Sequence, residues 1–357
     1  MGTGPTMQIL AADRDGIHFG AARLTAGELV AFPTETVYGL GADATNAAAV
    51  RSVFTAKGRP SSDPLIVHVD SSAMASEVGD LGSRNGVVAT LVEEFWPGPL
   101  TVVVPRSTRI GRRVQVAAEV SEGTTLGLRC PANETALELI SAAGVPVAAP
   151  SANRFGRVSP TTAAHVVDEL GRSVPWVIDG GPTALGIEST VVSMRGDRAT
   201  VLRPGAVPVE AIRAVLGEGH LEVPDHVLAQ DSDDVQSPGT GVSHYAPDVA
   251  LLLADSPSTA DGLEQALSEQ GVTVRRVELP EPQEAARTLY SLLRELDREA
   301  RGAAFDAVLV SALDPPGMGR AVNDRLLRAA HGHLEVSSAP DAVRAVLRRV
   351  RPGAPQR

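Results

Sequence analysis

Short apolar runs and helical patterns alternate through the first part of the chain. Residues 29–32 form an apolar run bounded by glycine and proline, a pattern typical of a buried strand. Apolar residues at helical spacing predict a helix over residues 47–57, with Asn46 as its N-cap and Gly58 as its stop. Further strands are predicted at residues 65–69, 100–104, 125–129, 145–149, 176–179, 190–193 and 200–202, and helices at 13–26, 83–95, 134–143 and from 161. This alternation predicts the α/β class.

The amino-acid composition of the sequence changes after residue 217. Residues 218–247 are rich in acids and turn formers and are predicted to be a linker. Beyond them, β-type runs alternate with helical patterns, which predicts a smaller Rossmann-like βαβαβα domain over residues 248–350. The runs are at 249–253, 272–277 and 307–310, and the helical patterns at 260–270, 284–301, 320–330 and 339–349. The first domain is predicted to span residues 8–217.

Composition excludes several classes of function. The chain of 357 residues has a formal charge of −11, which argues against a general nucleic-acid binder because phosphate neutralisation dominates such binding. Cys130 is the only cysteine, so an intramolecular disulfide and a cysteine zinc cluster are excluded, and we interpret it as a packing residue. Without an apolar run of 18 residues or an apolar signal core, we expect a cytoplasmic protein with no membrane segment.

Basic and hydroxyl residues lie beside the predicted strands of the first domain. They are Lys57, Arg59, Arg129, Ser151, Asn153, Ser189, Thr190 and Arg203. In open α/β sheets ligands bind in crevices at strand ends, so we predict a binding site there. Lys57 is the only lysine beside 31 arginines, which favours an anion-binding ammonium that projects from the helix end. A lysine retained by chance on a solvated helix end is the alternative.

The set of residues favours one type of chemistry. The sequence contains no G-x-S-x-G elbow, no H-E-x-x-H motif and no P-loop. Cations and hydroxyls without an obvious general base are typical of phosphoryl and nucleotidyl transfer, where positioning and charge neutralisation supply most of the catalysis. His68, at a predicted strand end, is either a satisfied histidine or a substrate contact. Gly39 and Gly41 are expected where the backbone turns tightly or approaches a ligand.

Ordered motifs through residues 10–215 resemble the Sua5/YrdC family. They are FPTETVYGLG (32–41), KGRP (57–60), WPGPLT (96–101), LRCP (128–131), APSAN (149–153), SPT (159–161), GIESTV (186–191) and LRPG (202–205). The segments SHYAP (243–247) and GRAVNDRL (319–326) resemble the longer, two-domain Sua5 branch, so the resemblance covers almost the whole chain. It implies a YrdC-like twisted sheet with flanking helices, followed by a smaller C-terminal domain.

The resemblance also implies an activity, threonylcarbamoyl-AMP synthesis. Members of the family combine L-threonine, bicarbonate and ATP, with Mg²⁺ accompanying the ATP, into threonylcarbamoyl-adenylate and pyrophosphate. The product serves the t6A modification of tRNA through a downstream tRNA threonylcarbamoyl transferase complex, and direct binding of tRNA is not required. No metal ligand from a protein side chain is implied.

The resemblance also implies roles for the residues of this chain that occupy the functional positions of the matching motifs. Lys57 and Arg59 would be catalytic. The residues that would hold threonine are Thr36, His68, Arg129, Ser151 and Ser189. The residues that would hold ATP are Arg59, Asp63, Thr125, Asn153, Thr161, Arg203 and Tyr245. Because glycines and a proline flank Tyr245, we expect the linker to close over the site as a lid.

Two departures from the family and two rival functions stay open. Asp63 stands where the family commonly has asparagine, which Mg²⁺ would tolerate, and residues 240–242 replace a bulkier, often basic segment. One rival is a double-stranded RNA-binding module of the same fold, against which the negative charge and the lack of interleaved aromatics weigh. The other is a carbamoyltransferase domain of the hydrogenase-maturation type, whose chains carry zinc-finger cysteines that are absent here.

Overall fold

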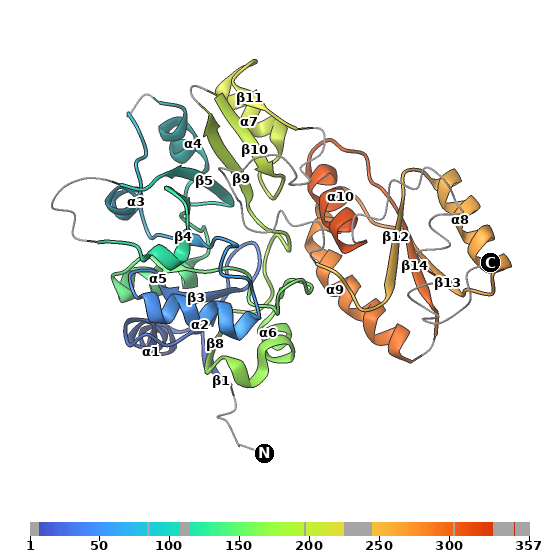
Figure 1. Ribbon diagram of the computed structural model, residues 1–357, viewed down its shortest axis with the longest axis horizontal. Helices are drawn as coiled ribbons and strands as arrows, with labels where there is room; N and C mark the ends of the chain where they lie inside the picture. The colour runs from blue at the N-terminus through green and yellow to red at the C-terminus, as the bar shows by residue number, and fades with distance from the viewer. Residues whose placement is uncertain are drawn as a thin grey trace. The chain divides into compact units, whose positions relative to one another are not determined.

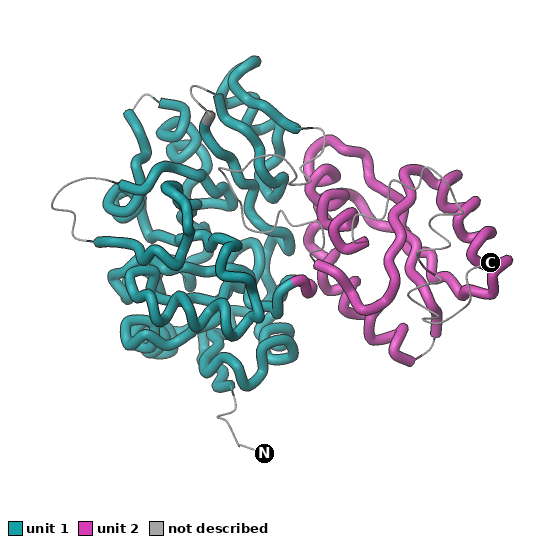
Figure 2. The backbone as a smooth tube through the Cα atoms, viewed as in Figure 1, with its two compact units in different colours: residues 1–155, 159–240 teal, residues 156–158, 241–357 magenta. Residues whose placement is uncertain are grey.

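The computed structural model describes residues 7–83, 86–107, 114–195, 198–224, 245–302, 304–330 and 346. The chain divides into two compact units, shown in Figure 2. Unit 1 comprises residues 1–155 and 159–240, and unit 2 comprises residues 156–158 and 241–357. Most of the predicted linker lies outside the described residues. Among the described residues, no helix has the length and apolar character needed to cross a membrane.

Unit 1 contains a mixed sheet whose strand order departs widely from the sequence order (Figure 1). From one edge to the other the strands are β1 (Gln8–Ala11), β8 (Trp176–Asp179), β2 (Val30–Phe32), β3 (Gly39–Asp43), β7 (Val147–Ala148), β4 (Ile66–His68), β6 (Thr125–Arg129), β5 (Leu100–Pro105), β9 (Thr190–Arg195), β10 (Arg198–Arg203) and β11 (Leu221–Glu222). The sheet contains parallel pairs such as β4–β6 and antiparallel pairs such as β5–β6. The predicted α/β class is confirmed.

Helices of unit 1 begin and end where their sequence provides caps. They are α1 (Arg14–Thr25), α2 (Ala47–Lys57), α3 (Ser72–Val78), α4 (Val87–Phe95), α5 (Glu134–Ala143), α6 (Ala163–Leu170) and α7 (Val209–Leu216). At α2 the Asn46 side chain accepts from two backbone N–H groups, and Gly58 adopts a left-handed conformation, with φ of 64°. Both predicted ends of this helix are therefore confirmed. Helices α3 and α7 were not predicted.

The central strands of the unit 1 sheet are buried on both faces, as β2 shows. Within β2, Val30 and Phe32 join one hydrophobic cluster, which includes Leu139 and Ile140 of α5, whereas Ala31 joins the other. This alternation follows from the two-residue period of a strand. Because both faces of this strand lie in the core, its sequence is a continuous apolar run without polar positions.

Gly39 and Gly41 lie within β3, so of the two expectations for them, a tight turn or a close approach to a ligand, the tight turn was wrong. A Cβ atom on Gly41 would lie 2.8 Å from the Phe32 ring and 3.0 Å from a methyl group of Val147. The glycine is required here by the close packing of β2 and β7 around β3, not by turn geometry.

Within its described residues, unit 2 has three parallel strands in the order β12 (Ala250–Ala254), β14 (Ala307–Ser311) and β13 (Val274–Val277). The strands alternate in sequence with α8 (Pro257–Glu269), α9 (Pro282–Arg301) and α10 (Met318–Ala329), as predicted for a Rossmann-like arrangement. Leu252 and Leu309 form its core with Leu263 and Leu267 of α8. The helix predicted at 339–349 falls outside the described residues, Val346 excepted.

Candidate functional site

Three loops of unit 1 carry five of the predicted site residues, and backbone hydrogen bonds join these loops. The five residues are Thr36, Ser151, Asn153, Thr161 and Ser189. The loop after β2 receives a bond at the Glu35 carbonyl from the Leu185 N–H, at 2.8 Å. Tyr38 in the same loop donates to the Pro160 carbonyl and accepts from the Ala152 N–H, each at 2.9 Å. The loops after β2, after β7 and before β9 are therefore joined to one another through their backbones.

Lys57 connects the end of α2 to the loop after β7. Its Nζ donates hydrogen bonds to the backbone carbonyls of Ser151 and Asn153, and its side chain is only 3% exposed. Burial lowers the pKa of Lys57 well below its usual value, and the nearby Arg59 charge lowers this pKa further. The expectation that this lysine projects from the helix end was wrong, because the loop of residues 151–153 covers it.

Arg59 forms a buried ion pair with Asp63. The Nη2 atom of Arg59 is 2.9 Å from a carboxylate oxygen of Asp63 and donates to the Pro64 carbonyl at 2.8 Å. Burial raises the pKa of Asp63, while the charges of Arg59 and Lys57 oppose that shift. Two basic side chains thus lie near one carboxylate, and both act on its pKa.

Arg129 forms a second buried ion pair, with Glu35. The Nη2 atom of Arg129 lies 2.7 Å from Oε1 of Glu35, and both side chains are at least nine-tenths buried. His68 is the partner of Arg129 across the β4–β6 pair. Burial, and then the Arg129 charge, lower the pKa of His68 to about 3, so its imidazole is neutral near pH 7.

This second pair retains unused hydrogen-bonding capacity. Among the described residues, both carboxylate oxygens of Glu35, Nη2 of Arg129 and Nδ1 of His68 are buried without a hydrogen-bond partner. Buried polar atoms in native proteins are normally satisfied, so such a cluster points to a ligand. Sequence reasoning missed Glu35, although it is the only acidic residue of the FPTETVYGLG motif.

Ser189 and Arg203, predicted for different substrates, lie side by side. The Arg203 Nη2 atom donates to the Ser189 carbonyl at 2.9 Å and to its Oγ at 3.1 Å. The Ser189 hydroxyl also contacts the Thr101 hydroxyl at 2.8 Å, a partner that the sequence did not indicate. The Arg203 charge lowers the pKa of Asp63, so it also acts on the Lys57–Arg59 group.

The remaining predicted residues of unit 1 are more dispersed. Thr36 shares a hydroxyl contact of 2.8 Å with Thr34, and the Thr161 hydroxyl lies 3.3 Å from Nδ1 of His165. Thr125 begins β6 and Arg129 ends it. At about 3.3 Å per residue these two are roughly 13 Å apart, so the structure does not bring them together. A ligand that contacts both would extend along β6.

Tyr245 belongs to unit 2. Its ring is 1% exposed and stacks on Tyr290 with ring centroids 5.6 Å apart, and the Arg325 guanidinium lies 5.3 Å from its centroid. Its backbone has a φ of 61°, a conformation uncommon outside glycine. The ATP contact of Tyr245 stays a prediction, and residues 225–244 of the expected lid lie outside the described residues.

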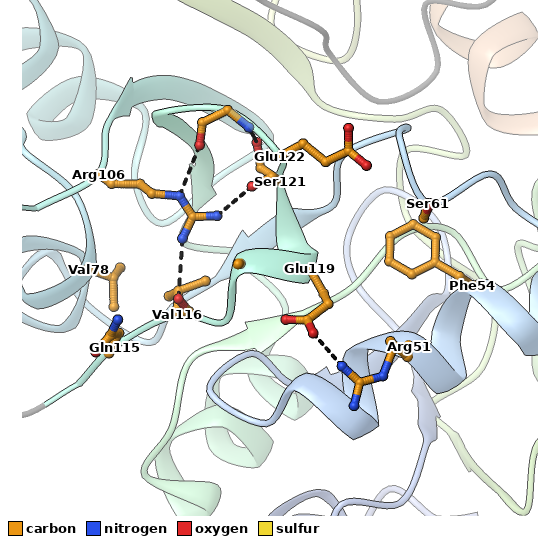
Figure 3. A pocket seen from close by; sticks show the side chains of 12 residues that line it. Arg51, Phe54, Ser61, Val78, Arg106, Gln115, Val116, Glu119, Ser121 and Glu122 are labelled. Carbon is orange, nitrogen blue, oxygen red and sulfur yellow. Dashed lines mark hydrogen bonds and ion pairs between the residues drawn. The ribbon is translucent and has the colours of Figure 1, made fainter.

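A cavity of about 680 Å³ has Phe54 and Ser61, which lies between Arg59 and Asp63 in the sequence, in its lining (Figure 3). Its arginines bind protein groups: Arg51 pairs with Glu119, and Arg106 donates to backbone carbonyls, including that of Ser121 at 2.8 Å. None of the predicted site residues lines it. We therefore place the functional site at the two buried ion pairs. Within the described part of the chain, no three His, Cys, Asp or Glu side chains come together to hold a metal ion.

Comparisons with protein families agree with these motifs. A Sua5/YciO/YrdC family model, described as telomere recombination, matches residues 22–205. A second model, described as the C-terminal domain of threonylcarbamoyl-AMP synthase, matches residues 207–331. The first matched segment contains both buried ion pairs.

Individual relatives cover most of the chain. The threonylcarbamoyl-AMP synthase of Bacillus subtilis is 38% identical over 88% of this chain and 92% of its own length. The enzyme of that name from Pyrococcus abyssi is 36% identical over 88% of this chain and 94% of its own length. The crystal structure of Pyrococcus abyssi Sua5 in complex with L-threonine superposes with a TM-score of 0.81 at 34% identity, covering 91% of this chain and 98% of that chain.

Proposed function

The chain belongs to the Sua5/YrdC family of threonylcarbamoyl-AMP synthases, and we propose that it joins L-threonine, bicarbonate and ATP into threonylcarbamoyl-AMP and pyrophosphate. The observation that supports these substrates is that two buried groups in unit 1 each hold an arginine. One group contains Arg129 with Glu35 and the neutral His68, and the other contains Arg59 with Asp63 and Lys57. The reaction brings two anions together and requires cations on both sides.

Threonine is assigned to the Arg129 group. A guanidinium binds a carboxylate through two parallel hydrogen bonds, which suits the carboxylate of an amino acid. His68 is neutral and has an unused Nδ1 among the described residues, so it pairs with a hydroxyl or amine without adding charge. The hydroxyl of Ser189 is the proposed partner of the threonine side chain, together with those of Thr36 and Ser151.

ATP is assigned to the group of Lys57, Arg59 and Arg203, together with Asn153, Thr161 and Thr125. The ATP contact of Tyr245, which belongs to unit 2, stays a prediction. The carbamate oxygen of N-carboxythreonine attacks the α-phosphorus, and the bond from that phosphorus to the bridging oxygen of pyrophosphate breaks. Fixed cations stabilise the charge that develops on the phosphoryl oxygens in a site shielded from water. Because both side chains are already in place and buried, Lys57 and Arg59 need little reorganisation during the step.

Mg²⁺ is proposed to arrive with ATP. Mg²⁺ in nucleotide sites is held mainly by phosphates and water, with one or two carboxylates. Asp63 is the acidic side chain of the proposed nucleotide group and would hold the ion, which would neutralise phosphate charge. Its pairing with Arg59 already offsets its negative charge, so the departure from asparagine at this position is compatible with an anionic ligand.

The product is proposed to pass to a tRNA threonylcarbamoyl transferase complex, because a mixed carbamic–phosphoric anhydride is an activated acyl donor. No observation favours the rival function of binding double-stranded RNA, and a chain with a net charge of −11 provides little phosphate neutralisation.

The test is a reconstituted reaction. The pure protein is incubated with threonine, bicarbonate, Mg²⁺ and labelled ATP, and pyrophosphate and a threonine-bearing adenylate are measured. We expect both products only when threonine and bicarbonate are present together. Pyrophosphate release that does not depend on threonine would contradict the proposal.

A further inference from the structure

Glu35 is a buried carboxylate next to the arginine assigned to the substrate. Its side chain is 10% exposed, and Oε1 lies 2.7 Å from Nη2 of Arg129. The bond from the Leu185 N–H to its carbonyl, at 2.8 Å, fixes the backbone of this residue. The acid is therefore held in place by the fold rather than carried on a solvated loop.

The contact between Glu35 and Arg129 is an ion pair without hydrogen-bond geometry. Both oxygens of Glu35 and the facing Nη2 of Arg129 are buried without hydrogen bonds among the described residues. A buried ion pair offsets its desolvation cost only when additional hydrogen bonds satisfy the remaining donors and acceptors. These atoms have the capacity to bind a ligand that carries both an acceptor and a donor.

We propose that Glu35 and Arg129 together bind the two charges of the α-amino acid, Arg129 the carboxylate and Glu35 the ammonium. We further propose that Glu35 takes the proton that this ammonium must lose. This inference rests on the proposed function and adds to it a residue that binds the amino group of the substrate. It also provides the general base that the sequence did not indicate.

The proton balance of the step is simple. The ammonium transfers one proton to the Glu35 carboxylate, which leaves a neutral amine. The amine nitrogen then attacks the carbon of bicarbonate, a C–N bond forms, and one water leaves to give the carbamate. Glu35 returns its proton to solvent before the next turnover. No electron transfer or further reactant is needed.

Other groups near the pair are unsuited to this role. His68 is neutral near pH 7 and therefore supplies no counter-charge for an ammonium. Burial raises the pKa of Cys130 to about 11, with contributions from Asp70 and Glu35, so its thiol does not titrate near pH 7. Asp63 is engaged by Arg59. Glu35 is the carboxylate that faces the substrate-binding arginine.

Binding of two ligands by titration calorimetry tests the first part of the inference. The probes are L-threonine and 3-hydroxybutyrate, which keeps the carboxylate and the hydroxyl but has no ammonium. Wild type should bind threonine roughly 10- to 100-fold more tightly, the size of a hydrogen bond to a charged group. Glu35→Gln should remove most of this difference. The variant should bind threonine more weakly than wild type does. Its affinity for 3-hydroxybutyrate should be unchanged or higher, because Glu35 no longer competes for Arg129.

Glu28→Gln is the matched control, since Glu28 also ion-pairs with an arginine, Arg23, at 3.3 Å, and lies outside the site. Equal affinity of wild type for the two probes would overturn the inference without any variant. Tighter binding of both probes by Glu35→Gln would show that Glu35 only competes for Arg129. Equal weakening of both, with a lowered melting temperature, would show a structural role.

The pH profile tests the proton transfer. At saturating threonine, Glu35→Gln should lower the rate of threonine-dependent pyrophosphate release by about 10²- to 10⁴-fold near pH 7. The rate should recover as the pH rises through the pKa of the substrate amine, because solution then supplies the neutral amine. A loss that is independent of pH would overturn the base role. Absence of threonine-dependent pyrophosphate from wild type would refute the proposed function instead.

Discussion

The ammonium of Lys57 donates a hydrogen bond to the backbone carbonyl of Asn153, a residue 96 positions later in the chain. A second bond reaches the carbonyl of Ser151. The only lysine of the chain therefore fixes the APSAN motif in addition to its proposed role toward phosphates. This double role changes what a substitution at residue 57 is expected to do.

Lys57→Met should lower both stability and activity. The variant keeps the apolar stem but leaves two carbonyls without their donor, at a cost of roughly 1–3 kcal/mol for each if it stays buried. Threonine-dependent pyrophosphate release should fall by about two to three orders of magnitude. Arg51→Met on the same helix, where the side chain is 60% exposed, should change the free energy of unfolding by less than about 0.5 kcal/mol. Chemical denaturation of both variants measures the difference, and equal stability would contradict the structural role of Lys57.

The proposed threonine pocket should discriminate sharply between amino acids with and without a side-chain hydroxyl. Valine lacks the hydroxyl that Ser189 and its buried neighbours are expected to pair with, and buried polar groups left unpaired are costly. Serine lacks only a methyl group and should be disfavoured by about 1–2 kcal/mol in kcat/KM. Competition assays with the three amino acids give these ratios. Comparable turnover of valine and threonine would refute the pocket.

His68 should make the protein less stable in acid. Its folded-state pKa is about 3, against an ordinary value of 6.5. Between these values the unfolded chain binds a proton that the folded protein does not. The contribution of the neutral imidazole to the free energy of unfolding is therefore complete above pH 6.5. It is lost as the pH falls toward 3, by up to about 1.4 kcal/mol per pH unit.

His68→Gln isolates this contribution. The free energy of unfolding of the variant, measured by urea titration, should depend less steeply on pH than that of wild type between about pH 6 and 4. Parallel profiles over that interval would show that His68 takes up a proton in the folded protein.

Gly41→Ala should destabilise unit 1. The added Cβ would lie 2.8 Å from the Phe32 ring and 3.0 Å from Val147, and overpacking of this kind costs typically about 1–3 kcal/mol. Gly127→Ala in β6 is the matched control, because its nearest neighbour would be at 3.5 Å, an ordinary contact. Thermal unfolding should separate the two variants, and a similar melting temperature for both would be evidence against the packing argument.

A chain that ends at Pro247 should have little more activity than one that ends at Pro208. The longer chain keeps residues 218–247, which the sequence predicts to be a lid, and the shorter chain lacks them. In the structure the Tyr245 ring stacks on Tyr290, which lies beyond this truncation point. If Tyr245 contacts ATP, both truncated chains should have much higher KM values for ATP than the full chain. Full activity of the shorter chain would exclude a role for Tyr245.

The sequence determined the elements whose ends depend on local contacts. Helix α2 was predicted to its last residue because Asn46 and Gly58 supply its caps within a few positions. Helix α5 matched for the same reason, with Asn133 and Gly144 at its ends. By contrast, α3 has only 7 residues, too few for a helical period to be visible, and β1 is an edge strand with a mostly exposed pattern. Ordered motifs determined the family.

Only the tertiary structure decided which side chains meet. Glu35 and Arg129 lie far apart in sequence, yet their atoms are 2.7 Å apart. That contact depends on the order and register of short strands such as β4, which has 3 residues, and a run of three apolar residues does not specify its neighbours. The burial of Lys57 and Arg59 could not be predicted from the sequence for the same reason, since the loop that covers Lys57 begins more than ninety residues later. Caps are encoded within one helical turn, whereas partners across a sheet are fixed by the packing of the whole unit.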